Sequence, residues 1–405
     1  MSSHPRSHVL ILYTDTGSGH RSVARALERA LRVLSSARAT PAERVPYAAL
    51  RNPVERHPLG NLFDLYGPVT RRAPRLFADV YHLSDHERVC DLTGRLAYGL
   101  LRQRFARLIA ATQPGVIVCV HSLLTRPLLQ TLRAGAHDIP LFSVVTDLTS
   151  IHHSWIVPAV DQCFVPTTEA RDEMARRGMA DERLCVSGLP VDPRFTTAIA
   201  GDERQSVRQA LGLHPDLFTV LVMGGGEGVG GLDRIAGALA TSCLPVQVIA
   251  VAGRNPALYR NLVKQQCEWA APHRVVGFAH NVPDLMRAAD VVVTKAGSVT
   301  IAEALACGLP IILSSVIEGQ ESGNVDYLER NGVGRLARGA SDVVAAVGHL
   351  LQLDEPSMQD LRARASRLSA PNASFVIAER ILATLDARQT HAADPDESAF
   401  EALLV

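Results

Sequence analysis

The sequence lacks several features that would assign it to other protein classes. It contains no apolar run close to the roughly 20 residues that a transmembrane helix needs. Its seven cysteines include no Cys-x-x-Cys pair, and their odd, scattered occurrence is typical of reduced, buried thiols. Its 41 basic residues balance 41 acidic ones, so no net charge favours nucleic acid. We therefore expect no nucleic-acid partner and a protein that is soluble or at most peripheral to a membrane.

Short apolar runs alternate with longer helical patterns along most of the chain. Strands separated by helices predict an α/β protein with parallel sheets, and 405 residues are too many for one core. The candidate strands are HVLILYT, GVIVCV, PLFSVVTD, QCFVPT, RLCVSG, FTVLVMGG, VQVIAVAG, HRVVGFA, DVVVTKAG and PIILSS. The sequence therefore predicts two Rossmann-like domains.

A proline-rich break, GLPVDPRF at residues 188–195, separates two similar halves. The charged segment GDERQSVRQALGLHPD follows, and FTVLVMGGGEGVGG then repeats the opening theme of a strand and a glycine-rich turn. We predict a first domain at residues 1–195, a second domain at 196–385 and a flexible tail at 386–405. The last helices of the second domain could pack back on the first domain.

Three glycine turns lie between a predicted strand and a predicted helix, at residues 17–20, 224–231 and 297–300. Glycines allow close backbone approach, and free N–H groups at a helix start carry partial positive charge, so each turn could bind an anion. A purely structural turn would look the same.

The third turn, in DVVVTKAGSVTIAEALACGLPIIL, is the most informative. We expect Ser298 or Thr300 to cap its helix, and Glu303 on the second turn to reach the ribose of a nucleotide bound there. An ordinary acid favoured by the helix dipole is the alternative for Glu303.

The next strand ends in SSVIEGQESGN, which places several polar side chains at the carboxyl end of a parallel strand. Open α/β sheets bind ligands at this edge, and such side chains suit hexose hydroxyl groups. A solvated loop is the alternative reading. The residues concerned are Glu318, Gln320, Glu321 and Asn324.

The segments TDTGSGHRSVARAL, LVMGGGEGVG and VVGFAHNVPDLMRAADVVVTKAGSVTIAEALACGLPIILSS resemble the monogalactosyldiacylglycerol synthases. They resemble more distantly the processive diacylglycerol glucosyltransferases and the GlcNAc transferase of peptidoglycan lipid synthesis. The similarity spans about residues 9–334. It implies a GT-B fold with the active site in a cleft between two Rossmann-like domains, an N-terminal acceptor domain for diacylglycerol and a C-terminal donor domain for the UDP-sugar. The implied reaction is inverting transfer of a hexose from a UDP-sugar to 1,2-diacylglycerol.

The resemblance also implies which residues bind the donor. The expected contacts are Phe278 and Ala279 at the uracil, Glu303 at the ribose, Gly297, Ser298, Thr300, Gly224, Gly225 and Gly226 at the diphosphate, and Gln320 and Glu321 at the hexose. Backbone N–H groups at the third turn could stabilise the leaving UDP, so we expect no cofactor and no strict metal requirement.

The catalytic base is expected to be His20 or Asp147, and the sequence leaves this choice open. An imidazole titrates near neutral pH, and a desolvated carboxylate at a strand end can also take a proton. A helix-capping His20 and a turn-forming Asp147 are the structural alternatives. On the acceptor side we expect Gly17, Gly19, His152 and Trp155.

Residues 57–83 interleave leucine and aromatic side chains with arginines, which suits an anionic membrane surface. Their membrane contacts are expected at Arg71, Arg72, Arg75 and Phe77, and packing of this segment on the domain core is the alternative. The expected location is the cytoplasm, peripheral on the inner face of the plasma membrane.

Galactose is favoured as the transferred sugar, because GGGEG and EGQESGN look more like the galactosyl enzymes. A UDP-glucose-dependent transferase is the first alternative. A UDP-sugar epimerase and a non-catalytic UDP-sugar binder are two others. Ser122 after His121, and His153 after His152, depart from the proline of the synthase pattern and blur the identity of the acceptor.

Overall fold

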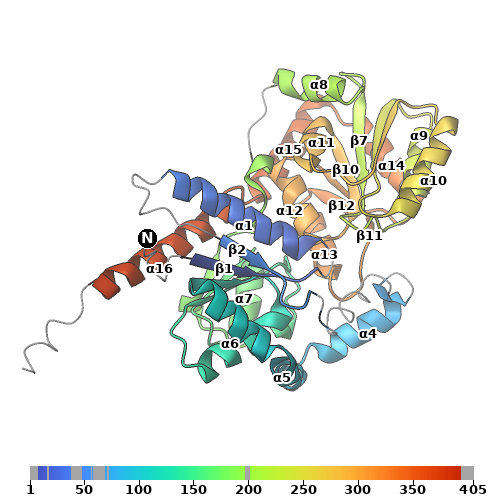
Figure 1. Ribbon diagram of the computed structural model, residues 1–405. Coiled ribbons are helices and arrows are strands. Elements are labelled where there is room, and N and C mark those ends of the chain that lie inside the picture. Colours follow the sequence, from blue (N-terminus) through green and yellow to red (C-terminus); the bar gives the residue numbers. More distant parts are fainter. Residues whose placement is uncertain are drawn as a thin grey trace, which may run out of the picture.

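The structure is a computed structural model that describes residues 8–15, 18–37, 48–55, 57, 69–70, 73–196 and 201–393. In this part of the chain, the strands form two six-stranded sheets, and every strand pairing is parallel. The helices cover both faces of each sheet (Figure 1). This arrangement confirms the predicted α/β fold with two Rossmann-like halves.

The first sheet has the order β2-β1-β3-β4-β5-β6 and the second β12-β11-β10-β7-β8-β9. The strands of the first sheet are β1 (His8–Leu12), β2 (Ala48–Arg51), β3 (Pro114–Cys119), β4 (Leu141–Val144), β5 (Gln162–Val165) and β6 (Leu184–Val186). Those of the second are β7 (Phe218–Met223), β8 (Val246–Val251), β9 (His273–Val276), β10 (Val291–Lys295), β11 (Ile311–Ser315) and β12 (Gly334–Leu336). All ten candidate strands are confirmed, and the two missed ones, β2 and β12, are short edge strands.

The helices pack through buried apolar side chains on each sheet. Around the first sheet lie α1 (Gly19–Ser36), α5 (Glu87–Thr112), α6 (Ser122–Ala134), α7 (Thr168–Arg176) and α16 (Ala373–Ala393). The helix α4 (Pro74–Ser84) instead packs against the loop after β4, where its Tyr81 contacts His152. Around the second lie α8 (Gly201–Ala210), α9 (Leu232–Ala240), α10 (Pro256–Gln265), α11 (Val282–Ala288), α12 (Ser298–Ala306), α13 (Ser322–Arg330), α14 (Ala340–Leu351) and α15 (Glu355–Leu368). Among the described residues, no helix combines the length and apolar character needed to cross a membrane.

The last helix belongs with the first sheet rather than the second. Ile377, Ile381 and Leu385 of α16 are buried in one cluster with Val23 and Leu27 of α1. Figure 1 shows α16 alongside α1. The helix continues to Ala393, beyond the start of the predicted tail, and residues 394–405 lie outside the described part of the chain.

The seven cysteines are all free, as expected. The expectation that they are buried holds for Cys90, Cys119 and Cys163, but Cys243 and Cys267 are exposed. Both exposed cysteines lie in short turns after helices, where no strand face buries them.

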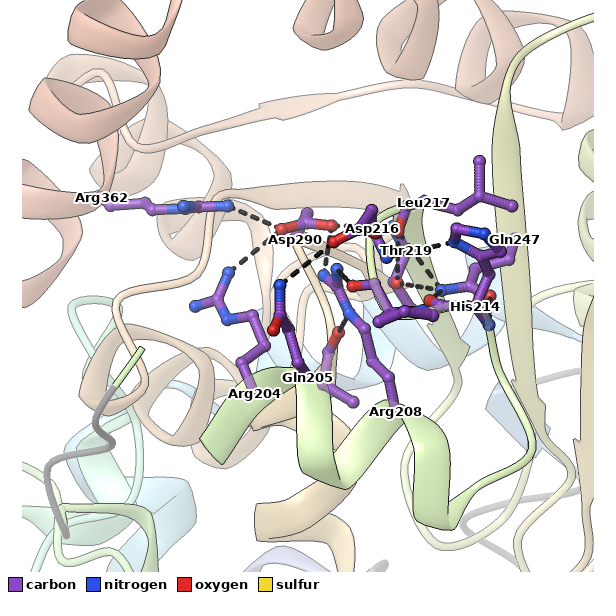
Figure 2. Close-up of polar contacts among 12 residues, drawn as sticks. Arg204, Gln205, Arg208, His214, Asp216, Leu217, Thr219, Gln247, Asp290 and Arg362 are labelled. Carbon is purple, nitrogen blue, oxygen red and sulfur yellow. Dashed lines mark hydrogen bonds and ion pairs between the residues drawn. The ribbon is translucent and has the colours of Figure 1, made fainter. Parts of the chain in front are cut away.

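A buried charge cluster fixes the amino-terminal edge of the second sheet. Asp290, just before β10, accepts from Arg204 (3.1 Å), Arg208 (2.6 Å) and Arg362 (2.7 Å), and from the Thr219 backbone N–H (2.8 Å). Figure 2 shows these side chains converging from α8 and α15. One carboxylate therefore holds two helices against the sheet, at the edge opposite the strand ends that form the cleft described below.

Replacing this carboxylate tests its contribution to stability. We expect Asp290→Ala to lower the free energy of unfolding by about 3–5 kcal/mol, because it leaves buried guanidinium groups without their anion. Urea unfolding followed by circular dichroism measures the change. The control, Glu268→Ala at an exposed position, should cost less than about 0.5 kcal/mol. Equal stability of the two variants would contradict this account.

Candidate active site

A cavity of about 630 Å³ lies in the cleft between the two sheets. Residues that follow strands of both sheets line it, so the carboxyl ends of the strands face one another across it. The predicted site residues that line it are Gly19, His20, Asp147, Gly224, Gly225, Gly226, Phe278, Ala279, Gly297, Ser298, Thr300, Glu303, Gln320 and Glu321. Asn324 also lines it, whereas Glu318 does not.

Other predicted residues lie away from the cavity. His152 is buried against the Tyr81 ring of α4, with ring centroids 4.7 Å apart, and its Nε2 lies 3.2 Å from the Ser84 hydroxyl. Phe77 is half-buried beside Tyr81, while Arg75 is exposed on α4. His152 therefore connects the loop after β4 to α4 and does not itself line the cavity. The remaining predictions, Gly17, Arg71 and Arg72, lie outside the described residues.

His20 lies in the first turn of α1, directly after the β1 strand end. Its Nδ1 is 2.8 Å from the Val120 carbonyl oxygen, and a carbonyl can only accept, so Nδ1 carries the proton. The other ring nitrogen, Nε2, is then left with a lone pair. Burial lowers the pKa of His20 to about 4, although the hydrogen bond to Val120 opposes this shift. The ring is therefore neutral at physiological pH and acts as a hydrogen-bond acceptor through Nε2.

Asp147 follows β4, and its pKa is shifted upward, whereas that of His20 is shifted downward. Burial raises its pKa to about 7, and the negative charge of Glu321 raises it further, while a hydrogen bond from Trp155 lowers it. The Trp155 indole N–H donates to Asp147 Oδ2 over 2.7 Å. Trp155 itself is buried and does not line the cavity, so it bonds to the carboxylate from the side away from the cavity. Asp147 can therefore exchange a proton near neutral pH.

The start of α12 differs in detail from the prediction. Gly297 occupies the N-cap position, and neither Ser298 nor Thr300 caps the helix with its side chain. The Ser298 hydroxyl instead donates to the Thr146 carbonyl across the cleft, over 2.6 Å. The Ser298 hydroxyl therefore bonds to the other half of the molecule instead of capping its own helix, as the local sequence predicts. The free backbone N–H groups of the helix start still face the cavity as a potential anion site.

The glycine loop after β7 lies beside this helix start, because β7 and β10 are neighbouring strands of the second sheet. A side chain at Gly224 would collide with the carbonyl oxygen of Val229, so the tight turn requires glycine. The Gly226 N–H donates to the Ser18 hydroxyl, 3.1 Å away beside α1. Through Ser18, the loop therefore forms a second polar bridge between the two halves.

Glu303 lies on the second turn of α12, as predicted, and lines the cavity. Burial raises its pKa to about 8, and the nearby negative charge of Asp192 raises it further. A carboxyl that is protonated or partly protonated can both donate to and accept from hydroxyl groups. This versatility suits a group that faces a sugar.

Sequence reasoning missed the cationic residues that line the cavity, Arg21, Arg25, Arg194, Arg254 and Lys295. Lys295, the last residue of β10, forms an ion pair with Glu321. Arg254 follows β8, pairs with Glu227 and places its guanidinium 5.3 Å from the centre of the Phe278 ring. The signal for Lys295 and Arg254 was positional, because Lys295 ends a predicted strand and Arg254 follows one, and both strand ends face the cleft. Each was overlooked because single basic residues in a loop are common.

The tryptophan behind Asp147 gives a pH prediction. The Trp155 hydrogen bond lowers the pKa of Asp147, so Trp155→Phe should raise that pKa above its present value of about 7. Carboxyl carbon NMR titration of Asp-labelled protein measures this directly. Trp269→Phe, which alters the other tryptophan in the second half of the chain, is the matched control and should leave it unchanged. An unchanged or lowered Asp147 pKa in Trp155→Phe would refute the proposed contact.

Comparison with known proteins agrees with this geometry. Residues 20–191 match the family described as monogalactosyldiacylglycerol (MGDG) synthase, and residues 219–367 match the glycosyltransferase family 28 C-terminal domain. A probable monogalactosyldiacylglycerol synthase of Glycine max is 33% identical over 394 residues, covering 91% of this chain and 70% of that protein.

Solved structures share the fold at low sequence identity. HepE of Anabaena, in complex with UDP-glucose, has a TM-score of 0.55 at 15% identity, covering 94% of this chain and 99% of that one. MurG of Acinetobacter baumannii has a TM-score of 0.58 at 12% identity, covering 92% and 99%. These likenesses confirm the GT-B fold.

One expectation from the sequence is wrong on this evidence. The curated relatives from soybean, rice, spinach and Arabidopsis are named as chloroplastic enzymes, which contradicts the expected location at the inner face of the plasma membrane. The cysteine pattern and the lack of a long apolar run do not distinguish one reducing compartment from another. The resemblance itself is confirmed: the chain is a glycosyltransferase and belongs to the monogalactosyldiacylglycerol synthase family.

Proposed function

We propose that this enzyme transfers a hexose, with galactose favoured, from a UDP-sugar to 1,2-diacylglycerol at a membrane surface. The observation that carries the proposal is one cavity in which an anion-binding helix start faces two candidate proton acceptors. The names of the curated relatives support the acceptor and the sugar, and HepE, which shares the fold, was solved with UDP-glucose. A UDP-glucose-dependent transferase remains the alternative.

In the proposed donor complex, the diphosphate lies between the α12 start and the glycine loop after β7. Backbone N–H groups on both sides would stabilise the negative charge that grows on the leaving UDP. The exposed ring of Phe278 beside Ala279 offers a surface for the uracil, and Glu303 suits the ribose. We propose that no metal cofactor is needed, so turnover should persist in the presence of a chelator.

We propose Asp147 as the base and His20 as the group that orients the acceptor. The acceptor hydroxyl oxygen forms a bond to the anomeric carbon as the bond from that carbon to the diphosphate breaks. The hydroxyl proton passes to the Asp147 carboxylate, whose pKa of about 7 matches working pH better than that of His20, which is about 4. Displacement in one step inverts the anomeric configuration.

The variant Asp147→Asn tests this assignment. Its kcat should fall by about 10²–10⁴-fold, while its affinity for UDP stays within about twofold of wild type. The wild-type rate should rise with pH through about 7 as Asp147 ionises. Asp172→Asn, at an exposed position on α7, is the matched control and should behave as wild type.

The assay supplies diacylglycerol in liposomes and compares UDP-galactose with UDP-glucose. Near-normal kcat in Asp147→Asn, with a collapse in His20→Ala instead, would reverse the two roles. Turnover with UDP-glucose alone would refute the galactosyl assignment.

The structure also offers a surface for the membrane, and it extends beyond the predicted segment. Six apolar side chains on two consecutive helices are between 53% and 76% exposed. Within each helix they lie three or four residues apart, so they share one face. We call them the α4–α5 apolar strip: Leu76, Val80, Leu83, Leu92, Leu96 and Leu100.

Charge and position favour a membrane as the partner of this strip. Exposed arginines accompany it on the same helices, at Arg75, Arg88, Arg95 and Arg102. Arginines near an anionic lipid surface each contribute about 1 kcal/mol, and leucines enter the interface. The helix α4 also lies close to the loop after β11, in which the hexose contacts are expected. A Cβ at Gly319 of that loop would be 2.9 Å from the Tyr81 ring of α4. An acceptor held in a bilayer at this strip would therefore be near the cavity.

Two leucines of the strip provide the test. Leu92→Ser combined with Leu96→Ser should weaken binding to vesicles of phosphatidylglycerol, phosphatidylcholine and diacylglycerol by about tenfold or more. The reason is that the two leucine side chains no longer transfer apolar surface from water into the membrane interface. Co-sedimentation measures the binding. The exposed valines of α10 and α16 give the control, Val263→Ser with Val376→Ser, which should bind as wild type. Equal vesicle binding by both double variants would rule out the strip as the membrane contact.

A further inference from the structure

The ion pair between Lys295 and Glu321 lies at the centre of the cavity. The Lys295 ammonium contacts Glu321 Oε1, and Glu321 Oε2 accepts from the Ile317 backbone N–H over 3.1 Å. The Glu321 side chain is 6% exposed and that of Lys295 is 22% exposed. The carboxylate is therefore fixed by backbone, while the ammonium has access to the cavity.

A register shift at the end of β10 turns the Lys295 side chain toward the cavity. The pairing of β10 with β11 shifts register between Thr294 and Lys295, so that Thr294 is opposite Leu313 but Lys295 is opposite Ser315. Such irregularities turn a side chain out of its normal alternation. Lys295 consequently points toward the ligand edge of the sheet, where it lines the cavity.

The ammonium lies where a diphosphate is expected. A Cβ on Gly297, the N-cap of α12, would be 2.6 Å from Lys295 Nζ, and a Cβ on Gly225 of the glycine loop after β7 would be 3.8 Å from Lys295 Cε. The start of α12 carries partial positive charge, so a cation beside it is unfavourable unless an anion is also present. In this structure, Glu321 is that anion.

The residue type is informative as well. Lys264 and Lys295 are the lysines of this sequence, and every other basic side chain is an arginine. Arginine forms rigid, bidentate pairs with carboxylates, whereas lysine presents a compact charge on a flexible stem. A lysine can therefore exchange one anionic partner for another more readily than an arginine can.

We propose that Lys295 exchanges partners during donor binding, from Glu321 in the free enzyme to the diphosphate in the complex. The exchange releases Glu321 Oε1 to accept from hexose hydroxyl groups. Recognition of the sugar then depends on prior or simultaneous binding of the diphosphate. The inference rests on the proposed UDP-sugar donor and assigns Lys295 a role that the sequence analysis did not give it.

The exchange predicts that the two members of one ion pair have opposite effects on UDP affinity. Lys295→Met should weaken UDP binding by about ten- to a hundredfold, because a charged contact to phosphate is lost. Glu321→Gln should strengthen it by several-fold to about tenfold, because the ammonium no longer has to leave a partner. Uridine, which has no phosphate, should bind both variants as it binds wild type.

Isothermal titration of UDP and uridine measures these affinities, and thermal unfolding checks that each variant is folded. In the double variant, Glu321→Gln should give no gain, because no ammonium remains to be released. This separates partner exchange from simple removal of a negative charge, which would strengthen UDP binding in either background. The exposed Lys264→Met is the matched control and should bind UDP as wild type.

The outcomes distinguish the exchange from the proposed function itself. If wild type does not bind UDP, the proposed donor is wrong. If wild type binds UDP but Glu321→Gln weakens binding, or strengthens it equally with and without Lys295, the exchange is wrong while the donor assignment stands.

Discussion

The positive end of α12 is the feature on which the rest of the cleft depends. The residues at its start line the cavity, and several polar contacts surround it. Glu321 holds Lys295 beside it, and the Ser298 hydroxyl reaches across to the other half of the molecule. With the bond from Gly226 to Ser18, these contacts connect the two sheets at the place where an anion would bind. Contacts between the two halves therefore lie directly beside the proposed anion site.

Burial gives the acidic groups of the cavity their chemical character. Asp147, Glu303 and Glu321 share one enclosed space, and burial raises the pKa of Asp147 to about 7 and that of Glu303 to about 8. Each group is tuned by a different neighbour. Trp155 supports Asp147, Asp192 raises the pKa of Glu303, and Lys295 keeps Glu321 paired. Acidic side chains in one cavity therefore differ in protonation because their immediate neighbours differ.

Much of this site could be predicted from the sequence, because strand ends and glycine turns are local patterns. The ten apolar runs became strands, and the glycine turns that follow the neighbouring strands β7 and β10 line the same side of the cleft. Contacts between distant segments could not be predicted. Trp155 behind Asp147, the partner of Lys295 and the diversion of Ser298 to Thr146 all depend on tertiary packing. The apolar strip was only partly foreseen, because exposure of leucines on α5 is decided by which face the sheet covers.

A crystal structure of the enzyme with UDP tests the central claim most directly. The account predicts a diphosphate bound to the backbone N–H groups at the start of α12, beside the glycine loop after β7. It also predicts that Lys295 Nζ contacts a phosphate oxygen and no longer contacts Glu321. A diphosphate bound elsewhere, or at this position with the Lys295–Glu321 pair intact, would contradict the account.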